Sequence, residues 1–297
     1  MTEIWIMSTL FRNLFYNKSV FTQMDNNSSI TLSLWFDNNA EEALKHYASI
    51  FPDSYMSNVN PVVASVNLSG VNFIGINGGP IFQINPSISM MVICESEEEI
   101  DTLWHQLLPG GAVLMALGSY PWSHRYGWLQ DKYNVNWQLY LGKLSDVHNQ
   151  KIVPTMMFCG SQQGQCKKAL AFYQSVFADY RSDGILKYPN GEMTGQIQHT
   201  QFVAHHSLFM AMDSGVPQDF TFNEGVSFVI HCKDQEEIDY YWNKLTEQGK
   251  ESMCGWCKDP FGVSWQVVPD NIDKLISSPS VNQALMKMKK IIIADLN

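Results

Sequence analysis

The fold is decided by the stretch VSFVIHCKDQEEIDYYWNKLTEQG, residues 226–249, because the chain contains a second version of it. The stretch ISMMVICESEEEIDTLWHQLLPGG, residues 88–111, repeats its cysteine, its Glu-Glu-Ile-Asp run and its tryptophan in the same order. Each version predicts an apolar strand followed by a helix, and the acidic residues at the junction are typical of a helix start. The chain therefore carries an internal duplication.

Two further blocks match in the same order on either side of this stretch. Downstream, YGWLQDKYNVNWQLYL at 126–141 matches CGWCKDPFGVSWQVVP at 254–269. Upstream, AEEALKHYASIF at 40–51 matches CKKALAFYQSVF at 166–177, and both have apolar residues at helical spacing. These blocks indicate a tandem duplication in which the first copy has a longer loop, MALGSYPWSHR at 115–125.

Each copy predicts a β-α-β-β half followed by a β-α-β-β-β half, so four similar modules fill the chain. We place the first copy at 30–142 and the second at 152–270, joined by a linker at 143–151. An N-terminal extension at 1–29 precedes them, and a helical tail at 271–297 follows.

Composition limits the classes of partner. The chain is 45% hydrophobic and 16% charged, with a formal net charge of −10 and a pI near 5.2. An acidic chain without a basic run predicts neither nucleic acid nor an anionic membrane as partner. No apolar run approaches the ~20 residues of a membrane-spanning helix. We read no signal peptide, and six sparse cysteines favour reduced thiols in the cytoplasm.

The Cys-x-x-Cys at Cys254 and Cys257 has three readings: plain cysteines at a strand end, incidental thiol reactivity, or part of a metal site. A redox dithiol stands at a helix N-terminus, whereas Asp-Pro-Phe-Gly and a strand follow here, which favours a hairpin. The first copy has Tyr126 and Leu129 at these positions, so the fold requires neither thiol. The first reading is preferred.

The two neighbouring blocks at 222–249 and 254–269 resemble the PhnB-like branch of the vicinal-oxygen-chelate superfamily. That superfamily includes glyoxalase I, bleomycin-resistance proteins and extradiol dioxygenases. Members of the branch often carry the label 3-demethylubiquinone-9 3-methyltransferase, and the tail ALMKMKKIIIADL at 284–296 is also similar. The resemblance implies an α+β fold of four βαβββ modules in two tandem glyoxalase-like domains. Their curved mixed sheets would form one cup-shaped pocket in each copy.

The resemblance also indicates where metal ligands would stand in this sequence. In metal-dependent relatives the ligands are His or Glu on the first and last strands of each module. Gln138 and Gln266 occupy the last-strand Glu position, and the first-strand segments 30–33 and 152–155 contain no His, Asp or Glu. Amide oxygens are weak neutral ligands, so we predict neither a metal centre nor a cofactor. The methyltransferase label gains no support, because GINGGP at 75–80 leads into no helix.

Five residues are candidates for contact with a ligand: Gln138, Gln266, His199, Trp128 and Trp256. Each Gln alternates with a Trp along its strand, so the Gln points away from the helix under which that Trp packs. The alternative readings are structural. A buried Gln can be satisfied within the fold, a strand His is often a core or edge residue, and the tryptophans at 128 and 256 can serve the final hairpin. We expect the adjacent His205 and His206 to be exposed in a turn.

The preferred function is metal-free binding of a small organic molecule, with no reaction assigned. The alternative is a metal-dependent lyase, isomerase or dioxygenase whose ligands have moved, for example to His199 and the cysteines. A third reading makes one copy a scaffold for association, with the longer segment at 115–125 as the feature that differs. Pairing of the two copies within one chain predicts a monomer or a weak homodimer.

Overall fold

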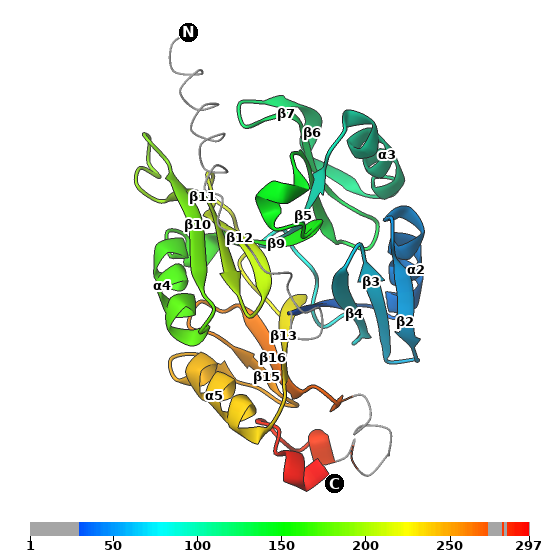
Figure 1. The fold of residues 1–297 in the computed structure, drawn as a ribbon, viewed down its shortest axis with the longest axis vertical. Coiled ribbons are helices and arrows are strands. Elements are labelled where there is room, and N and C mark those ends of the chain that lie inside the picture. Colours follow the sequence, from blue (N-terminus) through cyan, green and yellow to red (C-terminus); the bar gives the residue numbers. More distant parts are fainter. Residues whose placement is uncertain (1–29, 273–280, 282–283, 297) are drawn as a thin grey trace.

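The structure is a computed structural model that describes residues 30–272, 281 and 284–296 (Figure 1). The predicted N-terminal extension lies outside the described residues, as does most of the predicted tail helix. Two eight-stranded mixed sheets and the helices α2 to α5 form an α+β fold of four βαβββ modules, as predicted.

The elements follow the chain in this order. The first copy contains β1 (Thr31–Phe36), α2 (Ala40–Ile50), β2 (Tyr55–Val59), β3 (Val63–Leu68), β4 (Val71–Asn77), β5 (Ile88–Cys94), α3 (Glu97–Leu107), β6 (Ala112–Tyr120), β7 (Ser123–Gln130) and β8 (Asn136–Leu141). The linker forms η1 (Leu144–Val147). The second copy contains β9 (Ile152–Phe158), η2 (Gly160–Gln162), α4 (Cys166–Val176), β10 (Arg181–Lys187), β11 (Ile197–Ala204), β12 (Ser207–Asp213), β13 (Val226–Cys232), α5 (Gln235–Thr246), β14 (Lys250–Glu251), β15 (Trp256–Lys258) and β16 (Ser264–Pro269). The tail ends in η3 (Ile293–Leu296).

Each sheet combines one module from each copy. Sheet A has the order β14-β15-β16-β13-β1-β4-β3-β2, and sheet B has the order β10-β11-β12-β9-β5-β8-β7-β6. Two antiparallel pairs, β1 with β13 and β5 with β9, join the modules. These first strands are apolar and buried on both faces, so each requires a neighbour on both sides. The prediction of one cup per copy is therefore wrong.

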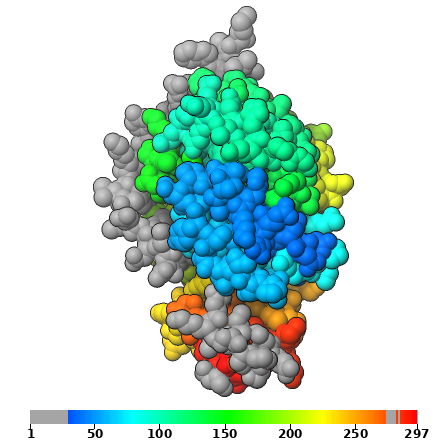
Figure 2. All heavy atoms as spheres, turned by 90° about the vertical axis from the view of Figure 1, so that its right-hand side faces the viewer, coloured from blue at the N-terminus to red at the C-terminus, as the bar shows by residue number. Residues whose placement is uncertain are grey.

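The helices cover one face of the sheets. In Figure 1, α2 and α3 lie on one side of the molecule and α4 and α5 on the other, and Figure 2 shows the segments of α2 and α3 side by side on one surface. Trp137 is fully buried beneath α2, with its ring 5.1 Å from Tyr47 and 5.2 Å from Phe51. The inner face is defined here as the sheet face turned away from α2–α5, and residues that alternate with Trp137 lie on it.

A buried carboxylate fastens α2 to the last hairpin of the first copy. Asp131 accepts hydrogen bonds from the Tyr47 hydroxyl at 2.6 Å, from the Trp137 indole at 2.8 Å, and from the backbone N–H groups of Tyr133 and Val135. Burial raises the pKa of Asp131. This Asp and the helical Tyr recur in both copies. Of the four donors, Tyr47 lies in another module and the other three lie in or beside the turn itself.

The second copy repeats this arrangement around Asp259. Its carboxylate accepts from the Tyr173 hydroxyl at 2.9 Å and the Trp265 indole at 3.1 Å, and from the N–H groups of Phe261 and Val263. Burial raises the pKa of Asp259 to about 6, against the opposing effect of its four donors. The stretch that begins with Cys-x-x-Cys therefore holds a hairpin with a carboxylate anchor.

Side chains cap the N-termini of α3 and α5. Ser96 accepts from the N–H of Glu99 at 3.1 Å, and the Glu99 carboxylate accepts from the N–H of Glu95. Asp234 and Glu237 form the same reciprocal cap on α5.

Three details of the predicted structure require correction. Residues 115–125 lengthen the hairpin of β6 and β7 and so form no long loop. His205 is 6% exposed and lies against Tyr241, although His206 is exposed as expected. The tail continues without helix from Met288 to Ile292, because carbonyls there accept hydrogen bonds from a turn of the second copy.

Candidate functional site

The inner face of sheet B places Gln138 at the centre of a hydrogen-bonded group. Its amide oxygen accepts from the Tyr126 hydroxyl at 2.7 Å, and its amide nitrogen donates to the Ser89 hydroxyl at 2.7 Å. Gln138 is 4% exposed. We expected a ligand or a neighbouring backbone group to satisfy this amide, whereas two side chains from β7 and β5 do so.

A row of four side chains, three of them polar, crosses the inner face beside this group. The register pairs Ser89 with Thr155, Thr155 with Met210, and Met210 with Gln201 across four strands. The Gln201 amide oxygen is buried and has no hydrogen-bond partner among the described residues. Since a buried polar group normally has a partner, Gln201 is a candidate contact for a ligand. Sequence reasoning missed it, although it follows His199 at the strand period of two.

Trp128 supplies the complementary donor. It forms a cross-strand pair with Gln138, so both side chains lie on the inner face. Its indole N–H is buried and, among the described residues, has no acceptor. The structure therefore brings together two of the predicted site residues, Trp128 and Gln138.

His199 lies on β11 of the same sheet, next to an irregularity in the pairing of β10 and β11. Four strand-to-strand steps separate it from Gln138 in the sheet order β11-β12-β9-β5-β8. Burial lowers the pKa of His199 to about 4, so its imidazole is neutral at pH 7. Because the sheets combine modules, His199 shares its sheet with Gln138 of the first copy and not with Gln266 of its own.

Aromatic rings border this face, and two of them come from the lengthened hairpin. Tyr120 and Trp122 stack with ring centroids 5.1 Å apart, and both contact the Tyr126 ring edge-on. The Tyr140 hydroxyl donates to the Trp122 carbonyl at 3.2 Å. The extra residues of the first copy thus support the tyrosine that holds Gln138.

The inner face of sheet A repeats part of this group. Gln266 forms a cross-strand pair with Trp256, and its amide nitrogen donates to the Ser227 hydroxyl at 3.0 Å. The Trp256 ring lies 6.1 Å from that of Trp35, which also contacts Phe82. The two remaining predicted residues, Gln266 and Trp256, therefore lie together, but on the other sheet from Gln138.

The side chains at these positions do not fit a metal ion. Both groups of the Gln138 amide are occupied, and the groups around it are hydroxyls and thioethers, without a carboxylate. Within residues 30–272, 281 and 284–296, no three His, Cys, Asp or Glu side chains lie close enough together to hold a metal. The relocated set of His199 and the Cys254–Cys257 pair is divided between the two sheets. Hard divalent cations require anionic oxygen ligands, which this face lacks among the described residues.

Burial disfavours the thiolate form of both cysteines of the Cys-x-x-Cys stretch. Cys257 lies on β15 and is 1% exposed, and burial raises the pKa of its thiol. Cys254 is half-buried, and burial also raises the pKa of its thiol. Because the thiolate is the nucleophile, both thiols are poorly reactive near neutral pH.

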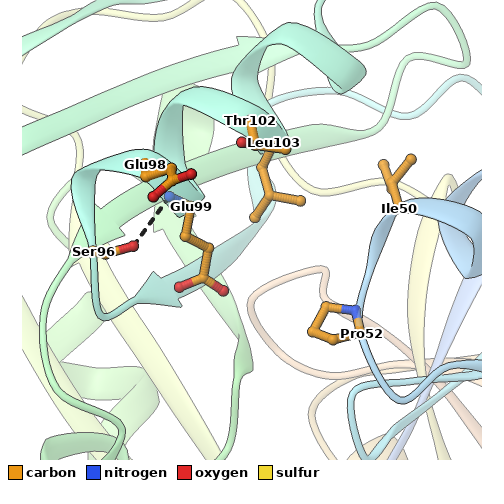
Figure 3. A pocket seen from close by; sticks show the side chains of 7 residues that line it. All are labelled: Ile50, Pro52, Ser96, Glu98, Glu99, Thr102 and Leu103. Carbon is orange, nitrogen blue, oxygen red and sulfur yellow. Dashed lines mark hydrogen bonds between the residues drawn. The ribbon is translucent and has the colours of Figure 1, made fainter.

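A pocket of about 260 Å³ lies away from both inner faces, between the end of α2 and the start of α3 (Figure 3). Its lining residues are Ile50, Pro52, Ser96, Glu98, Glu99, Thr102 and Leu103. In the second copy Tyr240 stands where Thr102 stands in the first, and its hydroxyl donates to the Val176 carbonyl on α4 at 2.8 Å. The pocket thus arises because Thr102 is too short to bridge its two helices.

No helix in the described part of the chain is both long and apolar enough to cross a membrane. No curated protein matches the chain, whereas solved structures do. A putative 3-demethylubiquinone-9 3-methyltransferase, PhnB protein, from Bacillus cereus is 41% identical over 38% of this chain and 98% of its own, with a TM-score of 0.36.

Glyoxalase I from Zea mays resembles the chain over a greater length. It is 11% identical over 85% of this chain and 94% of its own, with a TM-score of 0.54. A point mutant of the same enzyme is 12% identical over 90% of this chain and 99% of its own, with a TM-score of 0.55. At this identity the likeness concerns the fold alone.

The family assignment comes from a sequence model that matches the chain twice. The model described as 3-demethylubiquinone-9 3-methyltransferase matches residues 28–140 and residues 150–268, one match for each copy. Together the two matches cover most of the chain, which therefore belongs to the 3-demethylubiquinone-9 3-methyltransferase family as a tandem, PhnB-like member.

Proposed function

We propose that the chain binds a neutral, planar organic molecule on the inner face of sheet B, without a metal ion. The observation that carries this proposal is the pair of buried, complementary groups without a partner among the described residues: the Trp128 indole N–H and the Gln201 amide oxygen. A donor and an acceptor on one largely apolar face are typical of a small-molecule site. Five strand-to-strand steps separate the two groups in the sheet order β11-β12-β9-β5-β8-β7, so a small ligand would satisfy one of them: an acceptor would bind Trp128, or a donor would bind Gln201.

The charge of the ligand follows from the side chains around these groups. From β11 to β8 the polar side chains described above are hydroxyls and amides, and His199 is neutral at pH 7 because its pKa is lowered to about 4. The exposed Arg181 lies opposite Val203 on the edge strand β10. Away from that edge, a charged ligand would lose its hydration without gaining a counter-charge. The rings of Tyr126, Trp128 and Tyr140 favour a planar aromatic molecule.

The family description names a methyl transfer, and the described strand–helix connections give that reaction no support. The connection from β9 to α4 contains two glycines, Gly160 and Gly164. A Cβ at Gly160 would lie 2.4 Å from the carbonyl oxygen of Phe220. This glycine therefore permits close packing within the fold. We assign binding and no reaction.

The test compares three probes that share one ring system. 2-Naphthol is neutral at pH 7 and can both donate and accept, naphthalene can do neither, and naphthalene-2-sulfonate is anionic. We expect 2-naphthol to bind the full-length protein at least about fivefold more tightly than naphthalene, from about 1 kcal/mol per satisfied buried hydrogen bond. Naphthalene-2-sulfonate should bind more weakly than either. Equal affinities for the three probes would refute the proposal.

Variants locate the site. Trp128→Phe removes the indole N–H together with part of the ring, and Gln201→Met removes the amide at nearly constant volume. The variant that removes the group in contact with the probe should weaken 2-naphthol binding about fivefold more than naphthalene binding. Trp242→Phe is the control. Trp242 lies on α5, and its indole N–H donates to Glu251 on β14, away from the inner face of sheet B. An effect of Trp242→Phe equal to that of Trp128→Phe would place the probe elsewhere.

A further inference from the structure

The end of the chain covers the inner face of sheet A. Ile291 and Leu296 are 0% and 2% exposed, and they pack against Val229 of β13 and Val268 of β16. Both valines lie on the inner face, because Phe228 and Val267 beside them belong to the core under the helices. Residues 284–296, here called the strap, thus lie on the same side of sheet A as Gln266.

The strap is held by a turn and not by a strand. Cys254 and Gly255 have φ values of 59° and 82°, and their N–H groups donate to the carbonyls of Met288 at 2.7 Å and Lys289 at 2.8 Å. An added Cβ at Gly255 would lie 2.7 Å from the carbonyl oxygen of Val267. Glycine is therefore required at this position, and the first half of the Cys-x-x-Cys stretch acquires a role as the anchor of the strap.

The polar side-chain contacts of the strap are partly exposed. Gln235 donates to the carbonyl of Ile291 at 3.0 Å and accepts from the N–H of Ile293 at 2.8 Å. The ion pair of Lys289 with Glu251 is about half exposed, so solvent and salt screen it. Lys290 forms a second, partly exposed ion pair with Asp239 at 2.6 Å. Leu285 and Met288 are partly buried and pack beside the apolar contact of Ile291 and Leu296.

The face beneath the strap is polar in part. The register pairs Ser33 with Ser227 and with Ile74, and Ile74 packs with the strap residues. The Ser33 hydroxyl is 2% exposed and lacks a partner among the described residues. Ser33 corresponds to Thr155 of sheet B, because each faces the serine that binds the Gln of the last strand. An apolar strap beside a buried hydroxyl without a partner leaves a hydrogen bond unmade.

We propose that the strap is a reversible cover of a second binding face, formed by Ser33, Ser227, Gln266 and Trp256, which takes the same class of neutral planar molecule once the strap is released. The assignment of the ligand class rests on the proposed function of sheet B. The reversible cover itself does not rest on that proposed function, because it is inferred from the contacts of the strap alone. In the closed state the chain then offers one face for binding, and in the open state it offers two.

Hydrogen exchange tests the cover without any ligand. Ile291→Asp places a charge in the apolar contact of the strap, and Met286→Asp is the control, because Met286 is in the same segment and 71% exposed. In Ile291→Asp we expect the amides of Cys254 and Gly255 to exchange at least tenfold faster, while those of β13 and β16 keep wild-type protection. Met286→Asp should resemble the wild type.

Two exchange results would overturn the cover. Unchanged exchange at Cys254 and Gly255 in Ile291→Asp would show that Ile291 does not hold the strap. Loss of protection throughout β13 and β16 would show that residues 284–296 are an integral part of the core. The same measurement at higher salt should accelerate exchange at these two amides in the wild type, since it weakens the ion pair of Lys289 with Glu251.

Titration with 2-naphthol separates the second face from the first. We expect one binding equivalent for the wild type and two for Ile291→Asp, and Trp128→Phe or Gln201→Met should weaken only the first. One equivalent in Ile291→Asp, with the strap shown to be open, would refute the second face and leave sheet B as proposed. No binding by the wild type and one equivalent in Ile291→Asp would refute the proposal for sheet B and support that for sheet A.

Discussion

The carboxylate anchor of the second copy predicts a stability change that depends on pH. Tyr173→Phe removes the hydroxyl that donates to Asp259 at 2.9 Å and leaves the buried ring otherwise intact. Three donors then remain around the carboxylate, namely the Trp265 indole and two backbone N–H groups. A hydrogen bond to a charged group contributes about 1.5–3 kcal/mol, so the free energy of unfolding should fall by about 2 kcal/mol at pH 7.5.

The pH dependence follows from the pKa of Asp259, which burial raises from 3.8 to about 6 in the folded protein. Such a group contributes stability that is fully present below pH 3.8 and is lost as the pH rises through 6. At pH 4.5 the folded carboxyl is mostly protonated, and the hydroxyl of Tyr173 then donates to a neutral acceptor. The effect of Tyr173→Phe should therefore shrink to about 1 kcal/mol at pH 4.5.

Urea unfolding of the full chain at pH 4.5 and pH 7.5 measures both numbers. The control is Tyr240→Phe, whose hydroxyl donates to the backbone carbonyl of Val176, a neutral acceptor. Its effect should stay near 0.5–1 kcal/mol at both pH values. If Tyr173→Phe had the same effect at both pH values, the charged state assigned to Asp259 at neutral pH would be wrong. A matching pH dependence in Tyr240→Phe would show that the change arises elsewhere in the protein.

Two further predictions concern packing and acid stability. Thr102→Tyr should raise the free energy of unfolding by about 1 kcal/mol in urea titrations, because the new hydroxyl would donate to the Ile50 carbonyl as Tyr240 donates to Val176. A loss of stability would show that the pair α2 and α3 differs in spacing from the pair α4 and α5. His205 is buried with its pKa lowered to about 4, so its contribution is fully present above pH 6.5 and is lost as the pH falls toward 4. His205→Gln should accordingly flatten the fall in stability over that range, and an unchanged fall would assign it to other groups.

Local patterns predicted the modules well because their causes are local. The cap of α3 depends on Ser96 and Glu99, which are three residues apart, and the period of two along β8 placed Trp137 under a helix with Gln138 on the opposite face. The turn at Asp259 likewise followed from Pro260 and Gly262. In each case the residues that form the pattern lie within one element or one turn.

The site could be predicted only in part, because its members come from different modules. Gln138 and Trp128 are neighbours in one hairpin, whereas Gln201 reaches the same face through the pairing of β12 with β9 and of β9 with β5. Nothing near Gln201 in the sequence indicates which sheet it will join. His199 was assigned to the pocket of the second copy for the same reason, since the sequence repeat suggests that each copy closes on itself.

The pairing of modules between copies has a physical cause in the first strands. Within its module each of β1, β5, β9 and β13 stands at one edge, although both of its faces are buried. An apolar edge strand without a partner would promote association with other chains. The duplication removes that edge inside one chain, because β1 finds β13 and β5 finds β9. A chain with a single copy would have to find the same partner strand in a second molecule. Each inner face in this protein consequently joins strands from both copies, so the second copy contributes Thr155 and Gln201 to the face that holds Gln138 of the first.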